Sequence, residues 1–152
     1  YKPLQVDQVI ELVEKMEKGG LVLLTDDDPT TCETVIDFLK LEGYKIAAAK
    51  TGEEAVEAAK RREFDVILID IKLPIMNGLE TFRALKKTDP EVKAIMITGY
   101  PQEVGDLADQ ALQEDAYTVF NKPLDPDELL KVVNLIMEGK SKEDVNSEVN
   151  AF

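Results

Sequence analysis

The chain has 152 residues, of which 44% are hydrophobic and 32% are charged, a length and composition that fit one globular domain with a core of ordinary size. Its 31 acidic and 18 basic residues give a net charge of −13, which disfavours direct binding to nucleic acid or to anionic lipid. Because it contains no histidine, the sequence excludes His-based catalytic triads, His-ligated zinc and a phosphohistidine carried by the chain itself.

Apolar periodicity predicts helices and strands that alternate along the chain. A helical stripe over residues 7–18 comes first and ends at a pair of glycines. Continuous apolar runs, typical of strands buried on both faces of a sheet, then alternate with further helical stripes. In chain order, the pattern predicts a strand over 21–24, a helix over 30–42, a strand over 44–49, a helix over 51–62, a strand over 64–69, a helix over 79–87, a strand over 92–97, a helix over 102–114, a strand over 117–121 and a helix over 125–137. Residues 140–152 are polar, and we expect a flexible tail there.

This alternation predicts an α/β fold with a doubly wound, five-stranded parallel sheet and an extra N-terminal helix. We divide the chain into an N-terminal helix (1–19), one domain (20–139) and the polar tail (140–152). Residues 1–10 also resemble residues 121–130, because in both a Lys-Pro pair leads into a helix. We interpret residues 1–19 as the end of a preceding domain of the same kind, although two amphipathic helices can be alike by chance. The chain begins with Tyr1 rather than Met, so we expect a piece of a longer protein.

Polar residues follow four of the predicted strands. Asp26 and Asp27 follow the first strand, Asp70 the third, Thr98 the fourth and Lys122 the fifth. Ligands of open parallel sheets bind beyond the carboxyl ends of the strands, so we expect these side chains to converge. Three carboxylates held together would repel one another, and a hard divalent cation would relieve that repulsion. Oxygen ligands without His or Cys favour Mg²⁺, or Mn²⁺, over zinc.

The same residues have the chemistry needed to transfer a phosphoryl group to an aspartate. The hydroxyl of Thr98 and the ammonium of Lys122 suit the oxygens of a phosphoryl group, and a carboxylate can be the nucleophile. Asp70 is the better nucleophile because it follows the most continuous apolar strand and precedes a loop with proline and glycine. The adjacent Asp26 and Asp27 suit a metal better than a single attacking group.

Four motifs resemble those of the receiver domain of two-component response regulators. They are LLTDDDP at 23–29, VILIDIKLPIMNG at 66–78, IMITGY at 95–100 and FNKPL at 120–124. The likeness extends over about residues 20–139, and each motif lies at a predicted strand end. The resemblance implies a flavodoxin-like (βα)₅ fold. It also implies a signalling switch that catalyses only its own phosphorylation and dephosphorylation, rather than an enzyme with outside substrates.

The resemblance implies a role for each acidic position. Asp70 would be the phospho-accepting aspartate and a metal ligand. Asp27 would bind Mg²⁺ directly, and Asp26 would act on the metal through water. Lys72 would give its backbone carbonyl to the metal rather than its ammonium.

The resemblance also assigns the other end of the site, with one departure. Thr98 would be the switch hydroxyl that moves toward the phosphoryl group, and Lys122 would pair with that group. The bond between Lys122 and Pro123 would be cis. The family often has an aromatic residue three positions before the lysine, where this chain has Val119. Phosphorylation is therefore implied, but the usual aromatic switch is not.

Partners and location follow in the same way. Because the chain has no histidine, its phosphoryl donor must be a histidine kinase, a His-phosphotransfer protein or another domain of the same polypeptide. The resemblance implies a downstream output domain or protein and leaves a homodimer open. We expect no membrane insertion, since no apolar run reaches spanning length. The single cysteine, Cys32, allows no internal disulfide and suits a cytoplasmic protein.

Two alternatives remain open at this point. The segment at 26–30, DDDPT, also fits the Asp-x-Asp-x-Thr motif of haloacid-dehalogenase-like Mg²⁺-dependent phosphatases, with Asp26 as nucleophile. Against this, no acidic pair follows Lys122, and the chain lacks room for a cap insertion. The other alternative is a degenerate receiver that serves only as a binding module, which the complete set of acids, Thr98 and Lys122 disfavours.

Overall fold

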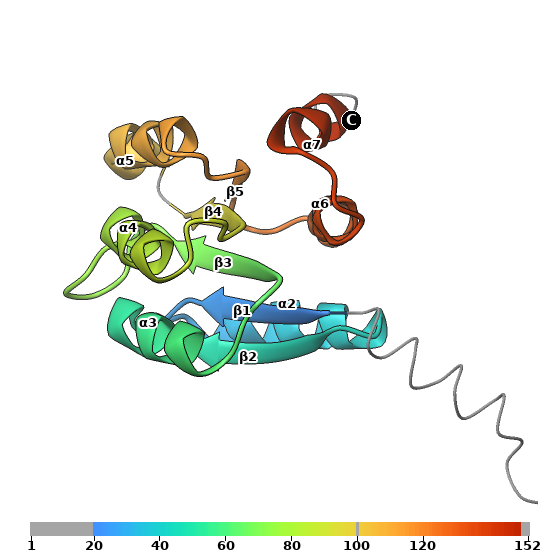
Figure 1. Cartoon of the computed structure of the whole chain (residues 1–152), viewed down its shortest axis with the longest axis horizontal. Coiled ribbons are helices and arrows are strands. Elements are labelled where there is room, and N and C mark those ends of the chain that lie inside the picture. Colours follow the sequence, from blue (N-terminus) through green and yellow to red (C-terminus); the bar gives the residue numbers. More distant parts are fainter. Residues whose placement is uncertain (1–19, 100, 150–152) are drawn as a thin grey trace, which may run out of the picture.

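The computed structural model describes residues 20–99 and 101–149. For residues 101–104 it describes the backbone but not the side chains. Strands and helices alternate along this part of the chain, as predicted (Figure 1). The elements are β1 (Leu21–Thr25), α2 (Pro29–Leu41), β2 (Lys45–Ala49), α3 (Gly52–Arg61), β3 (Val66–Asp70), α4 (Gly78–Thr88), β4 (Ala94–Thr98), α5 (Pro101–Gln113), β5 (Thr118–Asn121), α6 (Pro126–Met137) and α7 (Lys142–Val149).

The strands form one parallel sheet in the order β2-β1-β3-β4-β5. From β1 the chain goes outward to β2, returns across β1 to β3 and then continues to the other edge. The direction therefore reverses between β1 and β3, where Thr25 lies opposite Ile69. This topology confirms the predicted doubly wound, flavodoxin-like sheet. Because ligands bind at such reversals, the C-terminal ends of β1 and β3 are the expected position of a site.

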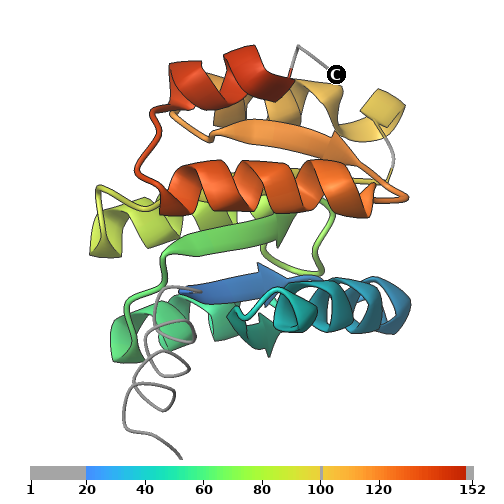
Figure 2. The ribbon, with the colours of Figure 1, turned by 90° about the vertical axis from the view of Figure 1, so that its right-hand side faces the viewer.

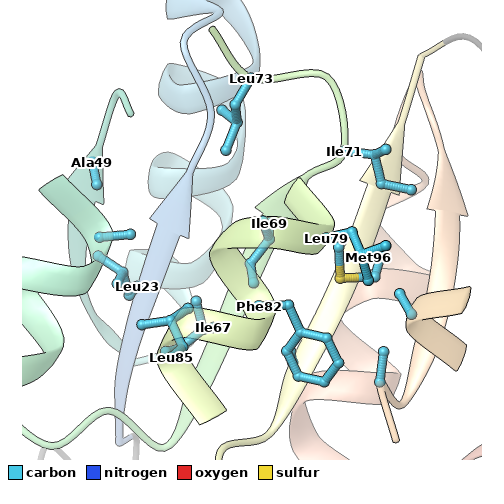
Figure 3. Packing of buried hydrophobic residues seen from close by; sticks show 14 of the residues in the cluster. Leu23, Ala49, Ile67, Ile69, Ile71, Leu73, Leu79, Phe82, Leu85 and Met96 are labelled. Atoms are coloured by element: carbon cyan, nitrogen blue, oxygen red, sulfur yellow. The ribbon is translucent and has the colours of Figure 1, made fainter. Parts of the chain in front are cut away.

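Helices cover both faces of the sheet, and the alternation of side chains along the strands explains why. Figure 1 shows α3, α4 and α5 on one face and α2, α6 and α7 on the other. Leu23 and Ile67 point toward the first group, and their neighbours Val22 and Leu68 toward the second. The central strands β3 and β4 are buried along their whole length, so both of their faces must be apolar. Figure 3 shows the first cluster gathered around Phe82.

Two helices that begin beside the sheet's C-terminal edge are capped by side chains. At α2 the side chain of Asp28 accepts a hydrogen bond from the backbone N–H of Thr30. At α4 the side chain of Asn77 accepts from the N–H of Glu80, whose carboxylate accepts from the N–H of Asn77 in return. Such capping boxes satisfy backbone groups that the first helical turn leaves unpaired. The loops leading into both helices are therefore fixed.

The extra helix that the structure describes is C-terminal, not N-terminal. Helix α7 occupies residues 142–149, where the polar sequence predicts a flexible tail. Its Val145 is fully buried in the cluster on the α2 and α6 face, and its Glu148 lies 3.4 Å from Lys131 of α6. Figure 2 shows α7 (dark red) above β5 (orange). A polar helix with one buried residue has no apolar stripe to reveal it.

Two predictions fall outside the described residues: the helix over 7–18 and the interpretation of residues 1–19 as the end of a preceding domain. Among the helices that the structure describes, none has the length and apolar character needed to cross a membrane.

Candidate functional site

Three carboxylates meet where the direction of the sheet reverses. Asp26 and Asp27 directly follow β1, and Asp70 is the last residue of the neighbouring strand β3. One carboxylate oxygen from each lies within 4.8 Å of the other two. Asp26 and Asp70 are buried, whereas Asp27 is exposed. The predicted convergence of these three side chains is therefore confirmed.

Lys122 reaches into this group from the end of β5. Its Nζ lies 2.9 Å from Oδ2 of Asp26 and 3.1 Å from Oδ2 of Asp70. The other oxygen of each carboxylate accepts a backbone hydrogen bond: the N–H of Asp28 donates to Asp26 at 2.9 Å, and that of Lys72 donates to Asp70 at 3.1 Å. Each buried carboxylate is thus held by one backbone donor and one shared ammonium.

The site is electrostatically strained despite these contacts. Burial, followed by the negative charge of Asp26, raises the pKa of Asp70 to about 6, while the Lys72 N–H and the Lys122 ammonium oppose the rise. Burial works against the ammonium of Lys122, but its hydrogen bond to Asp26 and the charges of Asp70 and Asp26 together raise its pKa. Lys122 therefore stays charged at neutral pH, and the carboxylates still outnumber the cation.

The donor atoms at this site fit a hard divalent cation. All three acidic ligands are oxygens, and a cation there would relieve the repulsion that raises the pKa of Asp70. Asp27 and Asp70 line a pocket of about 640 Å³, so an ion with its waters has room. The pocket is lined by Asp27, Asp28, Asp70, Lys72, Leu73, Pro74, Gly99 and Lys122.

The structure brings some of the remaining predicted residues to the pocket and leaves others behind it. Lys72 lines the pocket, and its backbone N–H contacts Asp70. Thr98 is buried at the end of β4 and does not line the pocket, but its carbonyl accepts the N–H of Lys122 at 2.8 Å. The bond between Lys122 and Pro123 is cis, as the resemblance implies. Val119 is partly buried and packs against the cluster on the α3 to α5 face.

Gly78 is a positioning residue that the sequence pattern marks only as part of a loop. A Cβ atom at this position would lie 2.5 Å from the carbonyl oxygen of Asp70 and 2.6 Å from Cα of Ile71. The N–H of Gly78 also donates to the carbonyl of Ile71 at 2.8 Å. The start of α4 therefore presses directly on the backbone of Asp70, which only glycine permits. The Asn-Gly pair before the helix is the sequence signal at this position. It indicates a turn, but it does not reveal that Gly78 contacts the backbone of Asp70 across the loop.

Replacing Gly78 by alanine is expected to lower the free energy of unfolding by about 1 to 3 kcal/mol, because the methyl group overlaps backbone that cannot easily move. Urea denaturation measures this loss. Gly105→Ala is the matched control, since a Cβ at position 105 of α5 meets nothing within 4 Å. That change should instead stabilise by about 0.5 to 1 kcal/mol. Equal effects at the two glycines would contradict the close approach.

The comparisons with known proteins agree with this geometry. The sequence model of the response regulator receiver domain family matches residues 22–134. The protein PilH of Pseudomonas aeruginosa is 31% identical over 121 residues, which cover 78% of this chain and 98% of PilH. The transcriptional regulatory protein ZraR of Klebsiella oxytoca is 34% identical over 108 residues, 71% of this chain but 24% of ZraR. The chain therefore spans about a quarter of the length of ZraR but nearly all of PilH.

Solved structures give the same result. A CheY-like receiver domain protein from Methanospirillum hungatei JF-1 is 30% identical, with a TM-score of 0.72, over 82% of this chain and 97% of that one. The CheX-CheY-BeF3-Mg+2 complex from Borrelia burgdorferi contains a chain that is 30% identical, with a TM-score of 0.68, over 74% of this chain and 84% of that one. The chain thus belongs to the response regulator receiver domains of two-component signal transduction, which are phosphoacceptor regulatory modules rather than classical enzymes.

Proposed function

We propose that this chain is the phosphoacceptor of a two-component phosphorelay and that Asp70 takes a phosphoryl group from a partner's phosphohistidine in a Mg²⁺-dependent reaction. One observation carries this proposal. The Asp70 carboxylate ends the central strand β3 beside two further carboxylates and the Lys122 ammonium, in a pocket open to solvent. The receiver family and the acidic pocket are both consistent with aspartyl phosphorylation.

The proposed roles divide among the residues of the pocket. Asp27, Asp70 and the carbonyl of Lys72 would bind Mg²⁺ directly, and Asp26 would bind it through water. The cation would neutralise charge between an anionic nucleophile and an anionic phosphoryl group. Mn²⁺ has the same ligand preferences and is the other candidate.

The proposed reaction is a displacement at phosphorus. A carboxylate oxygen of Asp70 forms the new O–P bond, the P–N bond to the donor's imidazole breaks, and the electron pair stays on that nitrogen. The Lys122 ammonium, already 3.1 Å from the Asp70 carboxylate, would pair with the oxygens of the incoming group. The Thr98 hydroxyl would move toward the same oxygens. Since the Thr98 carbonyl holds the Lys122 N–H, such a movement would involve the ends of both β4 and β5.

The surface formed by α5, β5 and α6 is then the proposed region of change. Phosphorylation would shift an existing equilibrium between two arrangements of this region. Val119 stands where many receivers have an aromatic residue, so its coupling to Thr98 would depend on aliphatic packing. The proposed partners are a histidine kinase or His-phosphotransfer protein and a downstream output domain or protein, all in the cytoplasm. A homodimer would be compatible with this function, whereas direct nucleic-acid binding would not suit the net charge of −13.

Mass spectrometry of the intact chain after treatment with acetyl phosphate and Mg²⁺ tests the proposal. We expect the wild type to gain the mass of one phosphoryl group, Asp70→Asn to gain none, and EDTA to prevent the gain. Asp37→Asn, an exposed change on α2, is the matched control and should be labelled like the wild type. Labelling of Asp70→Asn at the wild-type level would refute the assignment. Turnover of a small phosphate ester that is lost in Asp26→Asn would instead favour a phosphatase.

A further inference from the structure

Ile75, in the loop between β3 and α4, combines two unfavourable features. Its side chain is 93% exposed, and its backbone has a φ of 68°. Among the residues whose side chains the structure describes, Leu41 is the other exposed large hydrophobic, at 85%, and it lies on α2 with ordinary helical backbone. A single exposed hydrophobic residue is common on soluble proteins. A β-branched one held in the left-handed region is not.

The backbone around Ile75 forms a tight turn. The N–H of Met76 donates to the carbonyl of Pro74 at 2.8 Å, which makes Ile75 the central residue of a γ-turn with positive φ. This form of the γ-turn is rare and strained. Glycine or asparagine would adopt it at lower cost than isoleucine. The sequence therefore has the least suitable kind of residue for this position, both for the backbone and for solvent exposure.

The rest of the loop holds Ile75 outward. Ile71 and Leu73 are buried on one side of the turn, and the N–H of Gly78 bonds to the carbonyl of Ile71 on the other. The capping box of α4 fixes the segment that follows. Because these contacts anchor both ends of the loop, Ile75 is already held in place before a partner binds. Docking would therefore lose little conformational entropy in ordering the loop, which favours binding.

The position of Ile75 indicates what covers it. Its neighbour Pro74 lines the acidic pocket together with Leu73 and Asp70. The chain has no histidine, so a phosphohistidine must be brought to that pocket by another protein surface. Because adjacent Cα atoms are only about 3.8 Å apart, Ile75 lies next to the pocket residue Pro74, within reach of a surface that places an imidazole against the Asp70 carboxylate.

We propose that Ile75 is a docking residue for the phosphodonor protein, seated in an apolar recess beside the donor's phosphohistidine. This inference rests on the proposed function, since it concerns the partner of the same site. Docking would remove this exposed apolar side chain from water, and that burial is favourable. An acid-rich pocket gives a donor little apolar surface, so a protruding isoleucine would supply both affinity and register. Acetyl phosphate, which needs no docking surface, would not use it.

The test compares two phosphoryl donors. One is acetyl phosphate, and the other is the phosphorylated histidine kinase that labels the wild-type chain fastest in a panel from the source organism. For Ile75→Asn we expect kcat/KM with the kinase to fall about tenfold or more relative to labelling by acetyl phosphate. Ile75→Leu, which keeps an apolar side chain, should restore most of the transfer. A higher Tm for Ile75→Asn would show that the loss is not caused by unfolding.

Leu41→Asn is the matched control, because it removes a similarly exposed aliphatic side chain at the far end of α2, about 18 Å along the helix from its first residue. Its ratio of transfer from the two donors should match the wild type. Kinase transfer to Ile75→Asn at the wild-type rate would overturn this inference but leave the proposed function intact. The same holds if acetyl phosphate labels the wild type and no kinase does. A wild-type chain labelled by neither donor would overturn the proposed function and this inference with it.

Discussion

Asp70→Asn is expected to stabilise the metal-free chain at pH 7, by on the order of 2 to 3 kcal/mol. The pKa of Asp70 is raised from 3.8 to about 6 by burial and by the charge of Asp26. Each unit of such a shift corresponds to about 1.4 kcal/mol, and the ionised form is the one that the fold disfavours. An asparagine removes the buried charge while its carbonyl oxygen can still accept the N–H of Lys72.

The size of this effect depends on pH. Between pH 4 and 6 the folded chain binds more protons at Asp70 than the unfolded chain does, so the wild type loses stability as the pH rises through this window. The difference between the two proteins should therefore be largest above pH 6 and vanish below pH 4. Urea denaturation in EDTA from pH 4 to 7 measures it, with the exposed Asp37→Asn as control. A constant difference across this range would contradict the burial of an ionised Asp70.

Phe82→Ala is expected to cost about 3 to 5 kcal/mol of the free energy of unfolding. Phe82 is 0% exposed and lies among the largest fully buried side chains, on the helix whose first residue presses against Asp70 (Figure 3). Removing its ring leaves a cavity between α4 and the sheet that the neighbouring side chains can fill only in part. Urea denaturation at constant pH, with one m-value fitted to both proteins, gives the difference in the free energy of unfolding.

Phe38→Ala is the control for this loss. It removes the same ring from a half-buried position on α2, so most of the lost contact is replaced by water rather than by a void. We expect it to cost less than half as much as Phe82→Ala. Similar losses at the two positions would mean that the cluster around Phe82 is not the main core of the domain.

The strands could be predicted from short-range patterns, and the acidic site could be predicted from the sheet topology that those strands imply. Runs such as 66–69 are apolar on both faces, which only a central strand of a covered parallel sheet requires. Once the alternation predicts such a sheet, the carboxyl ends of its strands are brought together whatever the loops do. Asp26, Asp27 and Asp70 therefore converge as a consequence of topology rather than of any local signal.

What the sequence left hidden depends on contacts between distant segments. Helix α7 has one buried residue, Val145, and a single apolar position gives no periodic signal. The close approach of Gly78 to Asp70 is a backbone contact across a loop, which residue types do not encode. Neither the exposure nor the backbone conformation of Ile75 could be predicted, because isoleucine ordinarily indicates the opposite of both. Local rules fail at these positions because tertiary contacts decide them.

The arrangement of Lys122 between two carboxylates makes the pocket sensitive to electrostatic potential. Three carboxylates and one ammonium leave two negative charges, which a divalent ion would balance to zero. An acyl phosphate carrying about two negative charges in place of the single charge of Asp70 would tip the balance by one unit. Because Asp26 and Asp70 are buried, water screens that excess only weakly there, so nearby dipoles and the lysine must respond to it. The ends of β4 and β5, which carry Thr98 and Lys122, would then shift in response to one added negative charge.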